Sequence, residues 1–211
     1  EESNFFRLST VVLSPEMSWA PSAVRNNVAA AVGRDFDRDR LDRLIEIIAE
    51  AADIFNAEGI RPGLHNHVGT WIETEEEIEH VLAAIPASSL GAAFDIGHME
   101  WAGIDSVRMI QKHSDRLTDL HLKDVDLAAA RRSRETPAPY LRGMTEQLFL
   151  EPGLGDVNLD AVLELIPDSL PGFVIIEVDT ASMNPDQSAL VTQKWVQEHI
   201  PAASASNGAP L

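Results

Sequence analysis

The chain alternates short apolar runs with amphipathic segments of helical periodicity, and this alternation restricts its fold more than any other feature. Strands that alternate with helices are typical of a parallel sheet with helices packed outside it. We expect strands at Phe6–Leu13, Arg61–His67, Leu90–Ile96, Leu117–Lys123 and Phe173–Val178. A closed (β/α)8 TIM barrel needs eight such units, usually in about 250 residues. The α/β chain of 211 residues therefore predicts either about five βα units of a barrel or an open five-stranded sheet.

Helical periodicity fills the segments between these strands. Thr74 and Glu77 have the spacing of a capping box at a helix start. Helices are expected at Val24–Val32, Arg38–Glu58, Thr74–Ile85, Asp105–His113, Leu159–Ile166 and Gln187–Ile200, with a long excursion containing some helix at residues 126–150. The sequence shows no interdomain linker, so residues 1–200 are predicted to form a single domain. The small, polar residues 201–211 are predicted to form a disordered tail.

The charge balance restricts the partners of the chain. It has 34 acidic and 16 basic residues and a formal net charge of −18. An acidic surface repels phosphate backbones, so nucleic acid is not an expected partner. No apolar run reaches the length of a membrane span, about 18 residues or more. The lack of cysteine excludes thiolate zinc sites and a cysteine nucleophile, and it is compatible with a cytoplasmic location.

Polar side chains gather at the ends of four successive predicted strands. The active site of a βα barrel lies at the C-terminal ends of its strands. The four ends read Leu64-His-Asn-His67, Phe94-Asp-Ile-Gly-His98, Asp119-Leu-His-Leu-Lys-Asp124 and Ile175-Ile-Glu-Val-Asp179. Side chains alternate between the two faces of a strand, which predicts that His65 and His67 share a face, as do Asp119, His121 and Lys123.

Each of these residues has an ordinary explanation when it is taken alone. A histidine can be a hydrogen-bonded core residue, and an aspartate can cap the next helix. Their joint occurrence points instead to a metal site, because carboxylates in an apolar barrel mouth are costly to bury without a cation. Histidine combined with carboxylates suits manganese, cobalt, zinc, nickel or iron better than calcium. We therefore expect one divalent metal, with Mn, Co and Zn as the candidates.

Five segments together resemble the xylose isomerase-like TIM barrel superfamily of sugar phosphate isomerases and epimerases, and within it the inosose dehydratases. They are Leu64-His-Asn-His-Val-Gly-Thr70, Phe94-Asp-Ile-Gly-His-Met-Glu-Trp-Ala-Gly103, Asp119-Leu-His-Leu-Lys-Asp-Val125, Glu151-Pro-Gly-Leu-Gly-Asp156 and Val174-Ile-Ile-Glu-Val178. The resemblance covers roughly residues 6–199. It implies that the five predicted strands are the fourth to the eighth of a barrel.

The resemblance also implies roles for individual residues. Asp95, His121 and Glu177 stand at the positions of metal ligands. The fourth ligand of many members is a glutamate, and this sequence has His65 at the corresponding position. Glu177, His98 and Lys123 are the candidate catalytic residues. His67, Trp71 and Trp101 are the candidates for contact with the substrate.

The chemistry implied by the resemblance is proton removal next to a carbonyl group of a polyol or sugar. With His65 in place of a glutamate, the second carboxylate base of an epimerase is missing, which favours water loss from a keto-cyclitol or keto-sugar. In that reaction Glu177 is the strong base, and His98 or His67 protonates the departing hydroxyl. Lys123 holds the carbonyl oxygen, or acts as the base if desolvation lowers its pKa.

Three alternatives stay open at this point. The same metal site would serve a sugar isomerase or epimerase. An endonuclease that reads abasic DNA shares the superfamily, although the net charge of −18 argues against it. A non-catalytic or incomplete barrel fragment is the third, and a homo-oligomer would cover the edge strand Phe6–Leu13, which otherwise favours aggregation.

Overall fold

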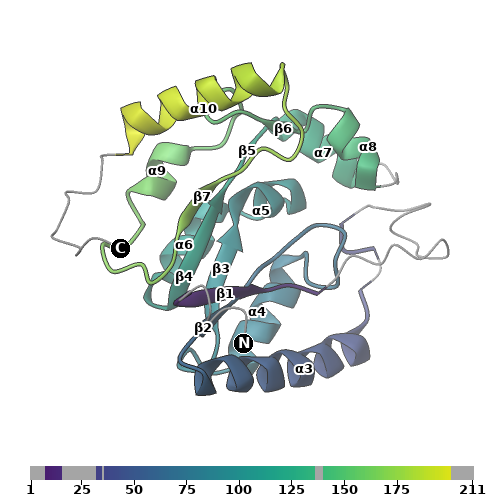
Figure 1. Cartoon of the computed structure of the whole chain (residues 1–211). Coiled ribbons are helices and arrows are strands. Elements are labelled where there is room, and N and C mark those ends of the chain that lie inside the picture. Colours follow the sequence, from purple (N-terminus) through teal and green to yellow (C-terminus); the bar gives the residue numbers. More distant parts are fainter. Residues whose placement is uncertain (1–7, 16–31, 35, 136–139, 201–211) are drawn as a thin grey trace, which may run out of the picture.

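A computed structural model of the chain describes residues 8–15, 32–34, 36–135 and 140–200 (Figure 1). The tail predicted at residues 201–211 lies outside these ranges. So does the helix predicted at Val24–Val32, apart from Val32 itself, which lies in a turn.

All five predicted strands are present and form one parallel sheet. They are β1 (Thr10–Leu13), β2 (Arg61–Leu64), β3 (Gly91–Asp95), β4 (Leu117–Leu122) and β7 (Val174–Ile176). Their order in the sheet, β1-β2-β3-β4-β7, is their order along the chain. This is the arrangement of successive βα units in a barrel wall, so the prediction of a partial barrel is confirmed.

The sheet is strongly curved. The hydroxyl of Thr10 on β1 donates to Asp119 Oδ1 on β4 at 3.0 Å, although two strands lie between them in the sheet. Next to this contact, the hydroxyl of Ser9 donates to the carbonyl of Pro171, just before β7, at 3.1 Å. The two edge strands therefore approach each other at their N-terminal ends, as they would in a barrel and not in a flat open sheet.

The helices pack around the sheet as the sequence predicts, with one addition. They are α3 (Arg38–Ala57), α4 (Glu75–Ala84), α5 (Ile96–Ala102), α6 (Ser106–Lys112), the 3-10 turn η1 (Ser114–Arg116), α7 (Leu127–Glu135), α8 (Tyr140–Thr145), α9 (Leu159–Leu163) and α10 (Pro185–His199). The predicted capping box of Thr74 and Glu77 is present at the start of α4. Helix α5 was not predicted, and it follows β3 without a loop because Asp95 ends the strand and caps the helix. None of the helices in the described ranges is long and apolar enough to cross a membrane.

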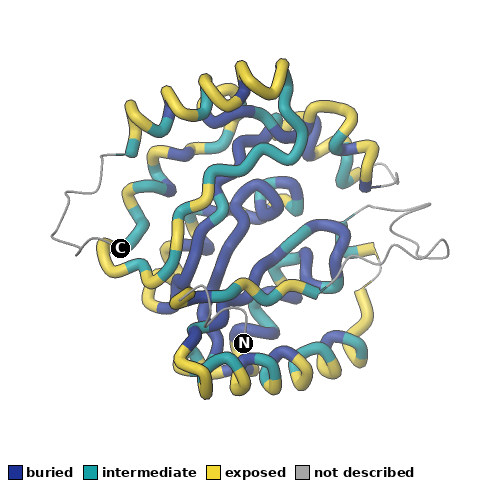
Figure 2. Tube along the Cα trace, in the orientation of Figure 1, coloured by how far each residue is buried: buried dark blue, intermediate teal, exposed yellow. Residues whose placement is uncertain are grey.

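Burial is deepest in the middle of the sheet, where every residue of β3 is buried (Figure 2). A second apolar cluster lies to one side of the strand ends and contains Val68, Trp101, Val125, Ala130, Tyr140, Leu148 and Phe149. Val125 and Phe149 of this cluster belong to a short antiparallel ladder of β5 (Asp124–Val125) and β6 (Phe149–Leu150), which was not predicted.

The loop at residues 151–157 is held by one buried carboxylate. Asp124 accepts hydrogen bonds from the backbone N–H groups of Val125, Gly153, Gly155 and Val157, at 2.8–3.1 Å. A Cβ at Gly155 would lie 2.3 Å from Asp124 Oδ1, so only glycine fits there. The loop fixes in turn the segment after β7, because the buried carboxylate of Glu151 accepts hydrogen bonds from the backbone and the hydroxyl of Ser182.

Candidate metal centre

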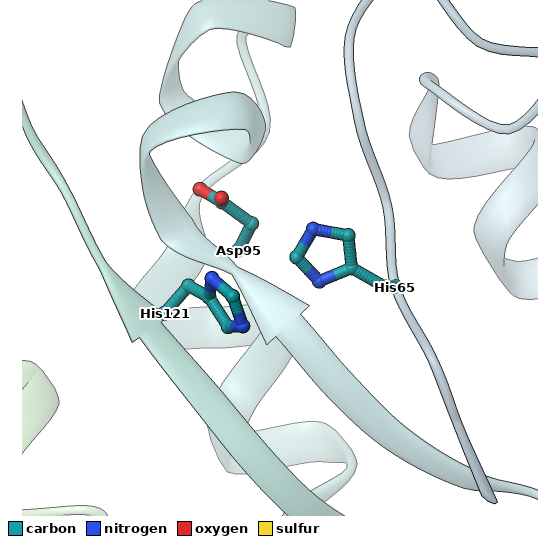
Figure 3. A group of neighbouring side chains, drawn as sticks. All are labelled: His65, Asp95 and His121. Atoms are coloured by element: carbon teal, nitrogen blue, oxygen red, sulfur yellow. The ribbon is translucent and has the colours of Figure 1, made fainter. Parts of the chain in front are cut away.

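Three predicted ligands meet at the C-terminal ends of β2, β3 and β4. His65 follows the last residue of β2, Asp95 ends β3, and His121 lies near the end of β4. Each offers one ligand atom, and these atoms lie within 4.8 Å of one another. Figure 3 shows the rings of His65 and His121 close together, with the side chain of Asp95 beside them. We call His65, Asp95 and His121 the first group.

Each side chain of the first group is held by a hydrogen bond at one of its two polar atoms. His65 Nδ1 lies 3.0 Å from the carbonyl of Ala93, and Asp95 Oδ1 accepts from the backbone N–H of His98 at 3.0 Å. His121 Nδ1 lies 2.7 Å from Glu177 Oε2. The remaining atoms, Nε2 of each histidine and Oδ2 of Asp95, are those with which a metal ion would bind.

The donor chemistry of the first group fits a divalent cation. Among the described residues, His121 Nε2 is buried with no hydrogen-bond partner, and the buried Asp95 Oδ2 has only an ion pair with Lys123 at 3.0 Å. Buried polar atoms normally have a hydrogen-bond partner, so the unpaired nitrogen of His121 indicates a ligand. Two imidazoles and a carboxylate form a mixed nitrogen and oxygen set that suits zinc, cobalt or manganese.

Glu177 lies beside the first group and contacts it through His121. The hydrogen bond from His121 and the charge of Lys123 hold the pKa of Glu177 below its usual range, against the effect of burial. A carboxylate on the outer nitrogen of a metal-binding histidine fixes the ring orientation. The structure thus favours Glu177 as the group that orients His121, whereas the sequence analysis named it as a direct ligand and as the base.

Lys123 lies at the centre of the strand ends and is only 2% exposed. Its ammonium group is 2.8 Å from Asp179 Oδ1, 3.0 Å from Asp95 Oδ2 and 3.2 Å from Glu177 Oε1. Burial alone would lower the pKa of Lys123, but the three carboxylates outweigh it and raise the pKa. Lys123 therefore stays protonated, and the hypothesis that desolvation makes it a base is not supported.

A second group of polar side chains faces the other side of Lys123. It consists of His67, His98 and Asp179, whose ligand atoms also lie within 4.8 Å of one another. His67 and His65 were expected on one face of a strand, but β2 ends at Leu64, and the two histidines separate into different groups. Asp179 had no predicted role, although it follows Glu177 by two residues and both carboxylates face Lys123.

Burial controls the protonation of the second group. It lowers the pKa of His67 to about 4, with help from the charge of Lys123, and it lowers the pKa of His98 well below its usual range. The same burial raises the pKa of Asp179 to about 6, although the charge of Lys123 acts against it. Both histidines are therefore neutral at pH 7.

The two tryptophans differ in their placement. Trp101 is fully buried, its Nε1 donates to the hydroxyl of Ser133 at 3.1 Å, and its ring stacks on Tyr140. A side chain with no exposed surface does not line a pocket, so this placement supports packing instead of the expected substrate contact. Trp71 lies under the guanidinium of Arg40, 3.7 Å from the ring centroid. Contact between Trp71 and a substrate stays a prediction.

The neutral histidines predict a loss of stability in acid. The pKa of a histidine is 6.5 in an unfolded chain, whereas that of His67 is about 4 in the fold. Between these values the unfolded chain binds more protons, so stability falls as the pH is lowered through this window. Urea unfolding of the chelator-treated protein at pH 7 and pH 5 measures the effect. The variant His67→Asn should show a smaller difference, and an equal difference would contradict this origin.

The comparisons with known proteins agree with this geometry. A sequence model described as the xylose isomerase-like TIM barrel matches residues 11–199, and the chain belongs to that family. An inosose dehydratase of Geobacillus thermodenitrificans is 28% identical over 166 residues, which are 77% of this chain and 56% of that protein. The chain thus spans about half the length of the curated relatives it matches.

Solved structures share the fold at low sequence identity. The probable 3-DHS dehydratase AsbF of Bacillus anthracis superimposes with a TM-score of 0.65 at 15% identity, over 93% of this chain and 65% of that chain. The IOLI protein, whose structure holds a zinc atom, has a TM-score of 0.60 at 15% identity, over 95% of this chain and 67% of that chain.

Proposed function

We propose that this chain carries the active-site side of a divalent-metal-dependent dehydratase, a lyase that removes water from a keto-cyclitol or keto-sugar. The observation that carries the proposal is the composition of the first group. His65 stands with Asp95 and His121, at the position where the resemblance leads us to expect a glutamate. The end of β2 thus offers an imidazole in place of the second carboxylate base that an epimerase needs on the opposite face of its substrate.

The comparisons support the same reaction class. The relatives named inosose dehydratase include proteins of Geobacillus thermodenitrificans and Bacillus licheniformis, at 28% and 25% identity. Their name describes water loss from an inosose, which is a keto-cyclitol. The zinc atom in the IOLI structure supports the metal part of the proposal.

In the proposed elimination, different residues of the chain have different roles. His65, Asp95 and His121 would hold the cation, which when bound supplies a Lewis acid for the substrate oxygen. The protonated Lys123, whose N–H groups face Asp95, Glu177 and Asp179, holds these three carboxylates in place around the site. Glu177 orients His121 through the 2.7 Å contact between its Oε2 and Nδ1.

His67 is the proposed proton carrier. Its Nδ1 lies 2.7 Å from the carbonyl of Val68 and therefore carries the ring proton, so Nε2 has the lone pair. Nε2 takes the α-proton of the substrate and returns it to the departing hydroxyl, so water leaves without net proton uptake. The carboxylate of Asp179, within 4.8 Å, stabilises the imidazolium that forms between the two steps.

The test of this function is a substrate panel in deuterated water. Keto-cyclitols and keto-sugars are incubated with the protein, and the unsaturated product is followed by absorbance and mass spectrometry. We expect product formation that a chelator stops and that Mn²⁺, Co²⁺ or Zn²⁺ restores. Exchange of the α-proton without an unsaturated product would identify an epimerase instead. Full turnover in verifiably metal-free protein would overturn the proposed mechanism.

A further inference from the structure

The second group has the donors of a metal site, but an ammonium group already uses them. Lys123 Nζ lies 3.3 Å from His98 Nε2 and 2.8 Å from Asp179 Oδ1. His98 Nδ1 also faces a donor, the backbone N–H of Val68, at 3.3 Å. The backbone N–H of Val68 can only donate, so Nδ1 accepts from it, and Lys123 Nζ stands beside Nε2, where an ion bound to this nitrogen would have to lie.

We propose that the Lys123 ammonium is a built-in cation that occupies a second metal site formed by His67, His98 and Asp179, and so limits the centre to one divalent ion. The inference rests on the proposed function, because the first group is taken to bind that one ion. Lys123 pairs with the carboxylate of Asp179 and stands beside His98 Nε2, where a second ion would have to bind. Its position is fixed by packing, since a Cβ at Gly97 would lie 2.3 Å from Lys123 Cβ.

The charges at the strand ends balance only when the Lys123 ammonium and one divalent ion are both present. Asp95, Glu177 and Asp179 bring three negative charges and Lys123 one positive charge, which leaves −2. One divalent ion in the first group neutralises the cluster. A second divalent ion beside the ammonium would leave a buried charge of +2, which is strongly disfavoured in an apolar site. If a neutral side chain replaced Lys123, the cluster would carry −3, and the second group would be an open site for a cation.

The position of Lys123 in the second group has a consequence for the proposed reaction. A metal ion on the second group would take the Nε2 lone pair of His67, which the proposed elimination needs for proton transfer. The ammonium reaches His98 and Asp179 and leaves His67 Nε2 available. Lys123 thus separates a metal-binding half of the centre from a proton-transfer half.

The first test is the metal stoichiometry of the variant Lys123→Met. We expect the folded variant to bind one equivalent of Zn²⁺ or Mn²⁺ more than the unaltered protein, measured by calorimetry and by metal analysis after dialysis. The further change His67→Asn should remove this additional equivalent. The matched control is Lys194→Met, since Lys194 is exposed on α10 and its loss should leave the stoichiometry unchanged. No additional equivalent in a variant that circular dichroism shows to be folded would overturn the inference.

A second measurement uses the unaltered protein and does not depend on the folding of a variant. Imidazole ¹⁵N resonances are followed while Zn²⁺ is added. We expect the Nε2 signals of His65 and His121 to move to zinc-bound positions, with those of His67 and His98 unbound at saturation. Zinc-bound signals from His67 or His98 would overturn the inference. Unbound signals from His65 and His121 would instead contradict the proposed metal site, so the two failures are distinguishable.

Discussion

The variant Asp95→Asn is expected to lose divalent metal binding while it keeps its fold. Asparagine retains an oxygen that accepts the 3.0 Å hydrogen bond from the backbone of His98, and it is as good a helix cap as aspartate. The change removes the anionic oxygen that faces His65 and His121 and that pairs with Lys123 at 3.0 Å, and Glu177 and Asp179 remain as partners of this ammonium. Loss of a residue behind a metal ligand costs about 10–100-fold in affinity, so loss of the ligand itself should cost at least about 100-fold. Calorimetric titration with Zn²⁺ or Mn²⁺ measures the change.

The control for this variant is the same substitution at another helix cap. Asp105 caps α6 by accepting from the backbone of Arg108 at 2.9 Å, and it is exposed and outside both groups. Asp105→Asn should therefore bind metal like the unaltered protein. Equal affinities for Asp95→Asn and Asp105→Asn would show that Asp95 is only a helix cap, which is its ordinary explanation from sequence.

The sequence predicted the strands and much of the candidate centre because both follow from local patterns. Apolar runs and helical periodicity located every strand of the large sheet. Parallel strands place their C-terminal ends at one edge, so Asp95 and His121 were expected together before any geometry was known. The first group brings them together with His65.

The sequence did not predict features that depend on where a strand ends or on which charges meet. The separation of His65 from His67 follows from the end of β2 at Leu64, because both histidines lie beyond the strand and its alternation of faces does not extend to them. The two-residue period of a strand therefore does not predict how these two side chains are placed. The raised pKa of Lys123 depends on three carboxylates from different strand ends, and Asp179, the nearest of them, had no predicted role. Burial alone would lower the pKa of Lys123, so the direction of its shift follows only from the assembled site.

The variant Arg116→Met is expected to cause a large loss of stability. The guanidinium of Arg116 is buried and donates to the main-chain carbonyls of Leu82, Ile85 and Leu90 at 2.6–3.1 Å. Leu82 and Ile85 lie at the end of α4, where carbonyls lack partners within the helix. Arg116 thereby joins the end of α4 and the start of β3 to the start of β4. Methionine fills similar space but leaves three buried carbonyls without donors, which should cost about 3–5 kcal/mol.

The same substitution at an exposed arginine separates this effect from a general loss of charge. Arg108 on α6 pairs with Glu75 at the surface, and exposed ion pairs contribute at most about 1 kcal/mol. Urea unfolding of Arg108→Met should therefore change little, whereas Arg116→Met should unfold at a much lower urea concentration. Similar midpoints for the two variants would mean that water replaces the guanidinium at the three carbonyls. Water would then reach the junction of α4, β3 and β4, although its contacts are buried.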